Sequence, residues 1–158
     1  MSKIIFLLPV VCFMIDQISK LIIRNNLFLG ESIKVFPFLY ITYITNTGTA
    51  FGLAKGNNTF FIIVILIVIF FIVAFKKSIF SPSWVSFISY SLILGGAFGN
   101  LLDRIMFGKV IDFIDFRFWP VFNFADTFVS IGAILYLAES LFRRDCVSST
   151  NSVRIIEH

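Results

Sequence analysis

Charged side chains are scarce in this sequence: 14% of residues are Asp, Glu, Lys or Arg, whereas 58% are hydrophobic. Soluble domains contain about 25% charged residues, so the composition excludes a water-exposed globular domain. A basic tract dense enough for nucleic acid is also lacking, because the net charge of +4 is spread along the chain. We therefore expect an all-α membrane protein with no nucleic-acid partner.

Cysteine and recognisable cleavage signals are scarce as well. Cys12 lies in the first apolar stretch and Cys146 in the polar tail, so a disulfide framework is not expected. The apolar stretch that begins at Ile4 imitates a signal peptide, but no cleavage site of small residues follows it. We interpret this stretch as an uncleaved first membrane span.

Four apolar stretches approach the length of about 20 residues that a membrane-spanning helix needs. They comprise residues 4–23, 60–75, 84–102 and 121–142. Four spans place both termini on one side, and the basic doublets at 76–77 and 143–144 favour the cytoplasm for that side. We predict one four-helix domain over residues 1–142, followed by a polar cytoplasmic tail over 143–158.

The two connections on the outer side contain more than simple turns. Residues 40–45 alternate in a period of two, which favours a short β-strand, and Asn46-Thr47-Gly48 would close it as a turn. Residues 103–120 mix acidic and aromatic side chains, as is typical of a segment at the membrane interface. The predicted fold is therefore four transmembrane helices with a small extracytoplasmic β-containing segment and an interfacial amphipathic segment.

Charged groups inside a membrane span are costly, so each needs a partner or a role. Asp16 and Lys20 are four residues apart and share one face of the first predicted helix. Mutual neutralisation of this pair is the favoured interpretation, and a direct catalytic role is the alternative.

A second polar group follows the glycine-rich end of the third predicted span. Gly95 and Gly99 have the small-xxx-small spacing that favours close packing of membrane helices. Asn100, Asp103 and Arg104 follow at i, i+3 and i+4, so they share one polar helix face. The sequence leaves two interpretations open: an Asp103–Arg104 pair, or an arginine that binds a ligand.

Two further aspartates are expected near the outer interface. Asp112 precedes the fourth predicted span, and Asp126 lies about one turn inside it. Two carboxylates in a low-dielectric site share a proton, which suits aspartic proteolysis because one accepts a proton from water while the other donates to the scissile carbonyl. The alternative leaves Asp112 in solvent and makes Asp126 a helix cap beside Asn123.

Taken in chain order, five motifs together resemble the bacterial lipoprotein signal peptidase (signal peptidase II) family. They are Asp16-Gln17-Ile18-Ser19-Lys20 and residues 46–52, 95–104, 110–114 and 122–126, within a match from about residue 14 to 132. The resemblance implies a monomeric aspartic endopeptidase of the bacterial inner membrane that needs neither metal nor cofactor. Such enzymes contact membrane lipid and cut prolipoprotein partners just before a cysteine that carries diacylglyceryl, with the active site near the outer face.

The resemblance also implies roles for individual residues of this chain. The catalytic pair is Asp112 and Asp126, the substrate-binding residues are Asn46, Asn100, Arg104 and Asn123, and the structural support comes from Asp16, Lys20 and Asp103. Asp115 falls outside the family motif. Two departures concern Thr49, where the family often has a small apolar residue, and a short connection between the two catalytic aspartates.

Two other classes of function are open to a bundle with intramembrane acids. A small ion-conducting or proton-conducting transporter would place its acids at the midplane, facing a pore. A non-catalytic scaffold that binds lipidated chains would keep its function without Asp112 and Asp126.

Overall fold

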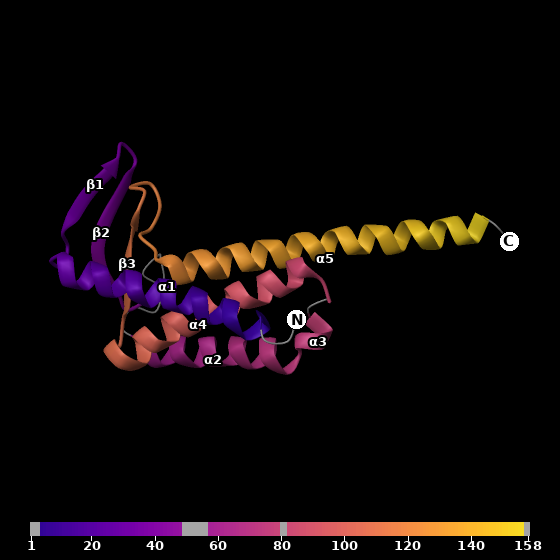
Figure 1. Cartoon of the computed structure of the whole chain (residues 1–158), viewed down its shortest axis with the longest axis horizontal. Helices are drawn as coiled ribbons and strands as arrows, with labels where there is room; N and C mark the ends of the chain where they lie inside the picture. Colours follow the sequence, from indigo (N-terminus) through magenta and orange to yellow (C-terminus); the bar gives the residue numbers. More distant parts are fainter. Residues whose placement is uncertain (1–3, 49–56, 80–81, 157–158) are drawn as a thin grey trace.

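A helix bundle with a small sheet at one end makes up the fold (Figure 1). The computed structural model describes residues 4–48, 57–79 and 82–156. The helices are α1 (Ile4–Asn26), α2 (Asn58–Ala74), α3 (Lys76–Ile79), α4 (Trp84–Phe107) and α5 (Phe124–Ile156), and the strands are β1 (Ser32–Phe36), β2 (Leu39–Asn46) and β3 (Val110–Asp115). Helix α5 extends well past the end of the bundle that lies opposite the sheet.

Helix α4 contacts each of the other three long helices. Ser83 caps its N-terminus by accepting a hydrogen bond from the backbone of Ser86, and Gly108, in the left-handed conformation, caps its C-terminus. A Cβ atom at Gly95 would lie 2.6 Å from Cys12 Cβ, and one at Gly99 would meet the carboxylate of Asp16. The prediction that these two glycines serve helix packing is therefore confirmed.

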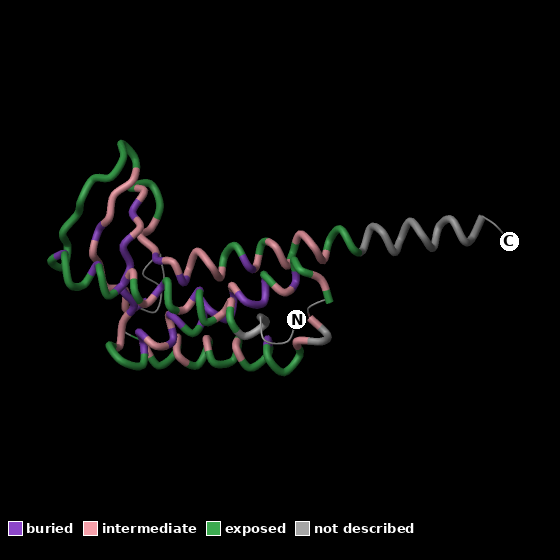
Figure 2. Tube along the Cα trace, viewed as in Figure 1, coloured by how far each residue is buried: buried purple, intermediate pink, exposed green. Residues whose placement is uncertain are grey.

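Much of the outer surface of the bundle is apolar. Helix α2 has no polar side chain from Phe60 to its end and buries only Ile72 (Figure 2). Within the described residues, Trp84–Phe107 and Phe124–Arg143 are long and apolar enough to cross a membrane. Exposed apolar helix faces of this kind suit contact with lipid, because lipid tails are as apolar as the side chains that they contact.

The sheet has the strand order β1-β2-β3, and both pairs are antiparallel. The predicted strand at residues 40–45 is confirmed, because β2 covers these positions. A register irregularity between Ile41 and Ile44 separates the two halves of the β2–β3 pairing and brings Ile44 opposite Asp112. Ile111 and Phe113 of β3 pack with the end of α1, so the sheet is fixed to the bundle.

The connection at residues 103–120 differs from the interfacial segment that we predicted. Helix α4 continues to Phe107, and residues 110–115 form the buried strand β3. This strand shows no alternation of polar and apolar residues because five of its six residues are buried, which removes the usual period-two signal. The exposed aromatics of this segment are Phe107 at the end of α4 and Phe118 and Trp119 in the loop that follows β3.

The last helix also differs in its limits from the predicted span at 121–142. It begins at Phe124, since Asn123 caps it, and it continues to Ile156 through the predicted polar tail. Near the opposite end of the bundle from the sheet, Glu139 of α5 accepts hydrogen bonds from Ser83 and Ser86 at the start of α4. Glu139 thus ties the two helices together, a role that the sequence did not reveal. Thr49, the other departure from the family, lies outside the described residues.

Candidate active site

Asp112 lies on β3 with its side chain almost fully buried, at 1% exposure. Asn46 Nδ2 on β2 donates to one carboxylate oxygen at 3.0 Å, and Asn123 Nδ2 donates to the other at 2.7 Å. The alternative of a solvated Asp112 is therefore wrong. Both donors come from residues that the sequence had placed at the site.

Asp126 lies in the first turn of α5 and forms a reciprocal cap with Asn123. The Asp126 backbone N–H donates to Asn123 Oδ1 at 2.9 Å, and the Asn123 backbone N–H donates to Asp126 Oδ2 at 3.3 Å. Asn100 Nδ2 donates to the remaining Asp126 oxygen at 2.8 Å. Asp126 is therefore a helix cap, as the alternative proposed, but its carboxylate also lines the cavity beside Asp112.

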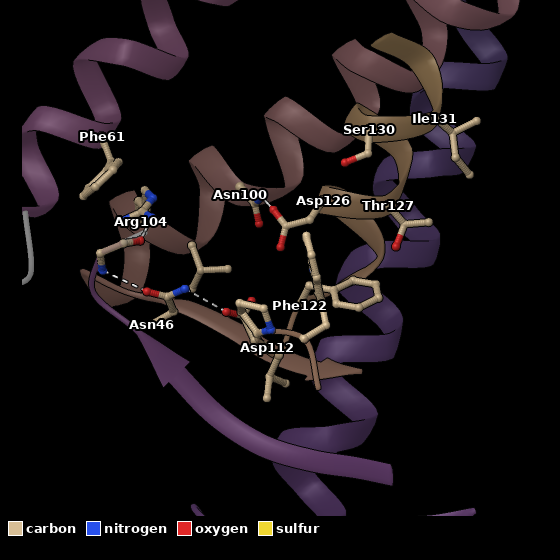
Figure 3. A pocket seen from close by; sticks show the side chains of 15 residues that line it. Asn46, Phe61, Asn100, Arg104, Asp112, Phe122, Asp126, Thr127, Ser130 and Ile131 are labelled. Carbon is tan, nitrogen blue, oxygen red and sulfur yellow. Dashed lines mark hydrogen bonds between the residues drawn. The ribbon is translucent and has the colours of Figure 1, made fainter. Parts of the chain in front are cut away.

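Asn123 connects the two aspartates and is fully buried. Its side-chain amide donates to the Asp112 carboxylate and accepts from the Asp126 backbone N–H, while its own backbone N–H donates to the Asp126 carboxylate, so one residue holds both aspartates. Figure 3 shows Asp112 from the strand and Asp126 from the helix converging on the same space, with Asn100 behind them.

Lys20 supports this arrangement from α1. Its ammonium group lies 2.7 Å from Asp16 and 3.0 Å from Asp103, and it donates to Asn100 Oδ1 at 3.1 Å. Asp16 in turn accepts from the backbone N–H of Ala125 at 2.9 Å, at the start of α5. The buried Lys20 ammonium and its two aspartates are therefore connected through Asn100 to Asp126.

The pairing of Asp103 differs from the pair that we considered with Arg104. Asp103 pairs with Lys20 of another helix, whereas Arg104 donates to the carbonyl oxygen of Gly48 at 3.2 Å. The Arg104 guanidinium also lies 4.4 Å from the centre of the Phe61 ring on α2. Arg104 thus lines the cavity without pairing with Asp103, and its role as a ligand-binding arginine stays a prediction.

Two supporting residues were not identified from the sequence. Gln17 Nε2 donates to both Asp16 and Asp103 at 3.1 Å, and Asn58 Nδ2 donates to the Arg104 carbonyl oxygen at 2.9 Å. The only signal for Gln17 was its place between Asp16 and Lys20 in the first motif. Asn58 lies outside the five motifs, so local sequence carried no signal for it.

An open cavity of about 530 Å³ lies against both aspartates. Its lining is polar near the aspartates and apolar around them. The lining residues are Asn46, Gly48, Phe61, Asn100, Arg104, Val110, Asp112, Trp119, Pro120, Val121, Phe122, Asp126, Thr127, Ser130 and Ile131. Strands, loop and helices α2, α4 and α5 all contribute, so the site exists only in the assembled bundle.

Electrostatics favour a shared proton at this site. Burial, together with the neighbouring carboxylate of Asp126, raises the pKa of Asp112 to about 7, although the hydrogen bonds from Asn46 and Asn123 oppose the shift. When one of these two carboxyl groups holds a proton and the other is ionised, the cavity contains both a proton donor and a proton acceptor. This combination can activate water and protonate a carbonyl oxygen at the same time.

Comparisons with known proteins identify one family for this chain. The sequence model described as signal peptidase (SPase) II matches residues 8–142. Lipoprotein signal peptidases of Desulfitobacterium hafniense and Halothermothrix orenii are each 40% identical to the chain, over 125 residues (78% of the chain and 83% of the relative) and 137 residues (84% and 94%) respectively. Two solved bacterial membrane enzymes, determined at 2.3 and 1.9 Å resolution, are 36% identical with TM-scores of 0.81 and 0.78, covering 88% of the chain and 88% and 93% of theirs.

Proposed function

Since the chain belongs to the signal peptidase II family, we propose that it removes the signal peptide from diacylglyceryl-modified prolipoproteins, cutting just before the lipidated cysteine. Family membership makes the chain a membrane-bound endopeptidase. The observation that carries the finer proposal is the buried Asp112–Asn123–Asp126 arrangement against an open cavity.

In the proposed reaction Asp126 is the base and Asp112 the acid. The N-terminus of α5 and the donor N–H groups of Asn100 and Asn123 stabilise an anion at Asp126, which takes a proton from water. The resulting hydroxide attacks the scissile carbonyl carbon while Asp112 donates its proton to the carbonyl oxygen. Asp126 then gives the proton that it took from water to the leaving nitrogen, while Asp112 takes back a proton from the tetrahedral diol. The C–N bond breaks, both aspartates return to their starting states, and the signal peptide leaves with a carboxylic acid end that ionises in solvent.

The remaining polar groups of the cavity suit binding of the substrate backbone. Asn46 and Asn100 each orient one carboxylate, and Arg104 presents a cation at the edge of the same cavity. Phe61 on α2 and Ile131 on α5 give the cavity apolar flanks towards the bilayer. A substrate whose helix and acyl chains lie in lipid can therefore enter from the side.

The proposal places α1, α2, α4 and α5 across the bacterial inner membrane, with both termini in the cytoplasm. Residues 1–142 form the catalytic domain and 143–158 a cytoplasmic tail, and one chain carries the complete site. The apolar exposed faces of the helices support this arrangement, and so does the burial of Asp16 and Lys20 away from lipid. The sheet then lies at the outer face, where water reaches the aspartates.

The alternatives of a transporter and a scaffold have less support. Asp16, an acid near the middle of the first helix, is fully buried and bound by Lys20 and Ala125 and does not face a pore. A scaffold would have no need for two carboxylates at a shared cavity, because burial of charge costs free energy of folding.

A cleavage assay tests the proposed function. The purified protein is incubated in lipid vesicles with a diacylglyceryl-modified prolipoprotein, and cleavage is followed by gel shift and by mass spectrometry of the new N-terminus. We expect a product that begins with the lipidated cysteine, formed at the same rate with and without a chelator. The matched control is the same prolipoprotein without lipid, which we expect to be cut poorly. An intact lipidated substrate would contradict the proposal.

The rate of cleavage is expected to fall as pH rises above about 7. Asp112 must hold its proton, and ionisation with a pKa of about 7 removes the acid, so kcat/KM falls by up to about tenfold per pH unit beyond it. Asn46 donates to the ionised carboxylate, so Asn46→Ala is expected to move this limb to higher pH. Profiles of kcat/KM for both proteins test this, and a flat alkaline limb would show that Asp112 is not the acid.

A further inference from the structure

Arg117 follows β3 in the short loop that leads to α5, and its backbone is unusual. It has a φ of 66° and is the one non-glycine residue with positive φ in the described part of the chain. A residue with a Cβ rarely adopts this conformation, so other interactions must hold it. The chain turns at Arg117, and its half-exposed side chain folds back over the sheet.

The side chain of Arg117 contacts all three strands. Its guanidinium lies 3.8 Å from the centre of the Tyr40 ring on β2 and donates to Ser32 Oγ on β1 at 2.7 Å. It also lies 3.5 Å from the Asp115 carboxylate at the end of β3, which accepts the Arg117 backbone N–H at 2.8 Å. One residue therefore links the edge strand β1 to the strand that carries Asp112.

The hydroxyl groups between these charges close a ring of hydrogen bonds. Thr42 Oγ1 donates to Asp115 at 2.7 Å, so the Thr42 oxygen accepts in its 2.6 Å contact with Ser32. Ser32 accepts a hydrogen bond from Arg117 and donates one to Thr42, so each hydroxyl group accepts one hydrogen bond and donates one. We call Ser32, Thr42, Asp115 and Arg117 the Arg117 clasp.

The Arg117 clasp is adjacent in the chain to two segments that line the cavity, the end of β2 and the loop before α5. Backbone hydrogen bonds between Ile114 and Phe122 close the loop that contains Arg117. The last four residues of this loop, Trp119 to Phe122, line the cavity. On its other side the clasp fixes β2 to β3 at Thr42 and Asp115, next to the half of the β2–β3 pairing in which Asn46 donates to Asp112.

We propose that Arg117 is a positioning residue. It holds the β1–β2 hairpin and the loop residues Trp119 to Phe122 in place, so that the substrate segment around the scissile bond binds in the correct position. This inference rests on the proposed function. Strand β1 is exposed along its whole length and pairs with β2 alone, so the clasp is what restrains it at the level of Thr42. Without the clasp, the loop residues that line the cavity lose this restraint, while Asp112, Asp126 and Asn123 keep their own contacts.

The test compares Arg117→Gly with Arg24→Gln. Glycine adopts a φ of 66° freely, so Arg117→Gly keeps the turn and removes only the side chain. Arg24 is a matched control because its guanidinium also lies over an aromatic ring, Phe107, at the same end of the bundle. For Arg117→Gly we expect KM to rise about tenfold with kcat within about twofold, since the interaction lost binds the ground state and the transition state alike. Arg24→Gln is expected to match wild type.

A second variant, Thr42→Val, opens the ring with nearly the same side-chain shape and should raise KM in the same direction. Unchanged KM in Arg117→Gly would overturn the proposal, and so would a fall of kcat together with the amount of folded protein, which indicates a purely structural role. These results differ from failure of the proposed function, in which the wild-type protein itself leaves the lipidated substrate intact.

Discussion

Asp112→Asn and Asp126→Asn are each expected to lower kcat/KM for lipidated prolipoprotein by at least about a thousandfold. An amide neither takes a proton from water nor donates one of comparable acidity, so either substitution removes one half of the acid–base pair. Because both residues act in one step, the double variant should lose little more activity than either single variant. Initial rates of cleavage in vesicles measure the loss.

The control for these variants is Glu139→Gln, which changes another acid of α5. Glu139 binds Ser83 and Ser86 at the far end of the bundle, so cleavage should continue. Thermal unfolding in detergent verifies that each variant is folded, and Asp112→Asn should unfold at the same or a higher temperature than wild type at neutral pH because it removes a buried acid beside Asp126. Substantial cleavage by either asparagine variant would disprove the catalytic assignment.

Lys20→Met is expected to destabilise the protein by about 3–5 kcal/mol, because it leaves two buried carboxylates without their cation. Lys20, Asp16 and Asp103 are each at most 2% exposed, so solvent cannot replace the lost interactions. The same substitution removes the donor that orients Asn100 towards Asp126. We expect low abundance in the membrane and a markedly lower unfolding temperature.

Combining Lys20→Met with Asp16→Asn and Asp103→Asn separates charge from packing. The triple variant carries no unpaired buried charge, so it should recover part of the lost unfolding temperature. Ser19→Ala is a matched neighbour on α1, since Ser19 bonds only to its own helix at the Asp16 carbonyl oxygen among the contacts described. A Lys20→Met protein that unfolds like wild type would contradict the role assigned to the buried pair.

Sequence reasoning succeeded where the physical signal is local. Apolar runs marked all four long helices, and the alternation at residues 40–45 marked β2. Asp112 and Asp126 could be paired in advance because carboxylates in a membrane protein are costly and often functional, and the ordered motifs resembled those of an aspartic peptidase family. The structure brings both to one cavity through Asn123.

The contacts that sequence reasoning missed are those made across the bundle. Asp103 and Arg104 are adjacent, but neighbouring helix residues point about 100° apart, so Asp103 meets Lys20 while Arg104 meets Gly48. Strand β3 is buried on both faces and so lacks a periodic pattern. The clasp around Arg117 depends on strand register, which no single segment of sequence determines.

The position of Asp16 and Lys20 on one helix also bears on how the chain is made. In the proposed membrane arrangement α1 is synthesised before α4 and α5, and Lys20, four residues after Asp16, gives it an internal counter-ion, so it can enter the bilayer as a neutral pair. Asn100 arrives later with α4, and the Ala125 N–H that Asp16 accepts arrives only with the last helix. A partly synthesised chain can therefore insert without cutting anything, because the protease is completed by the same contact that docks its final helix.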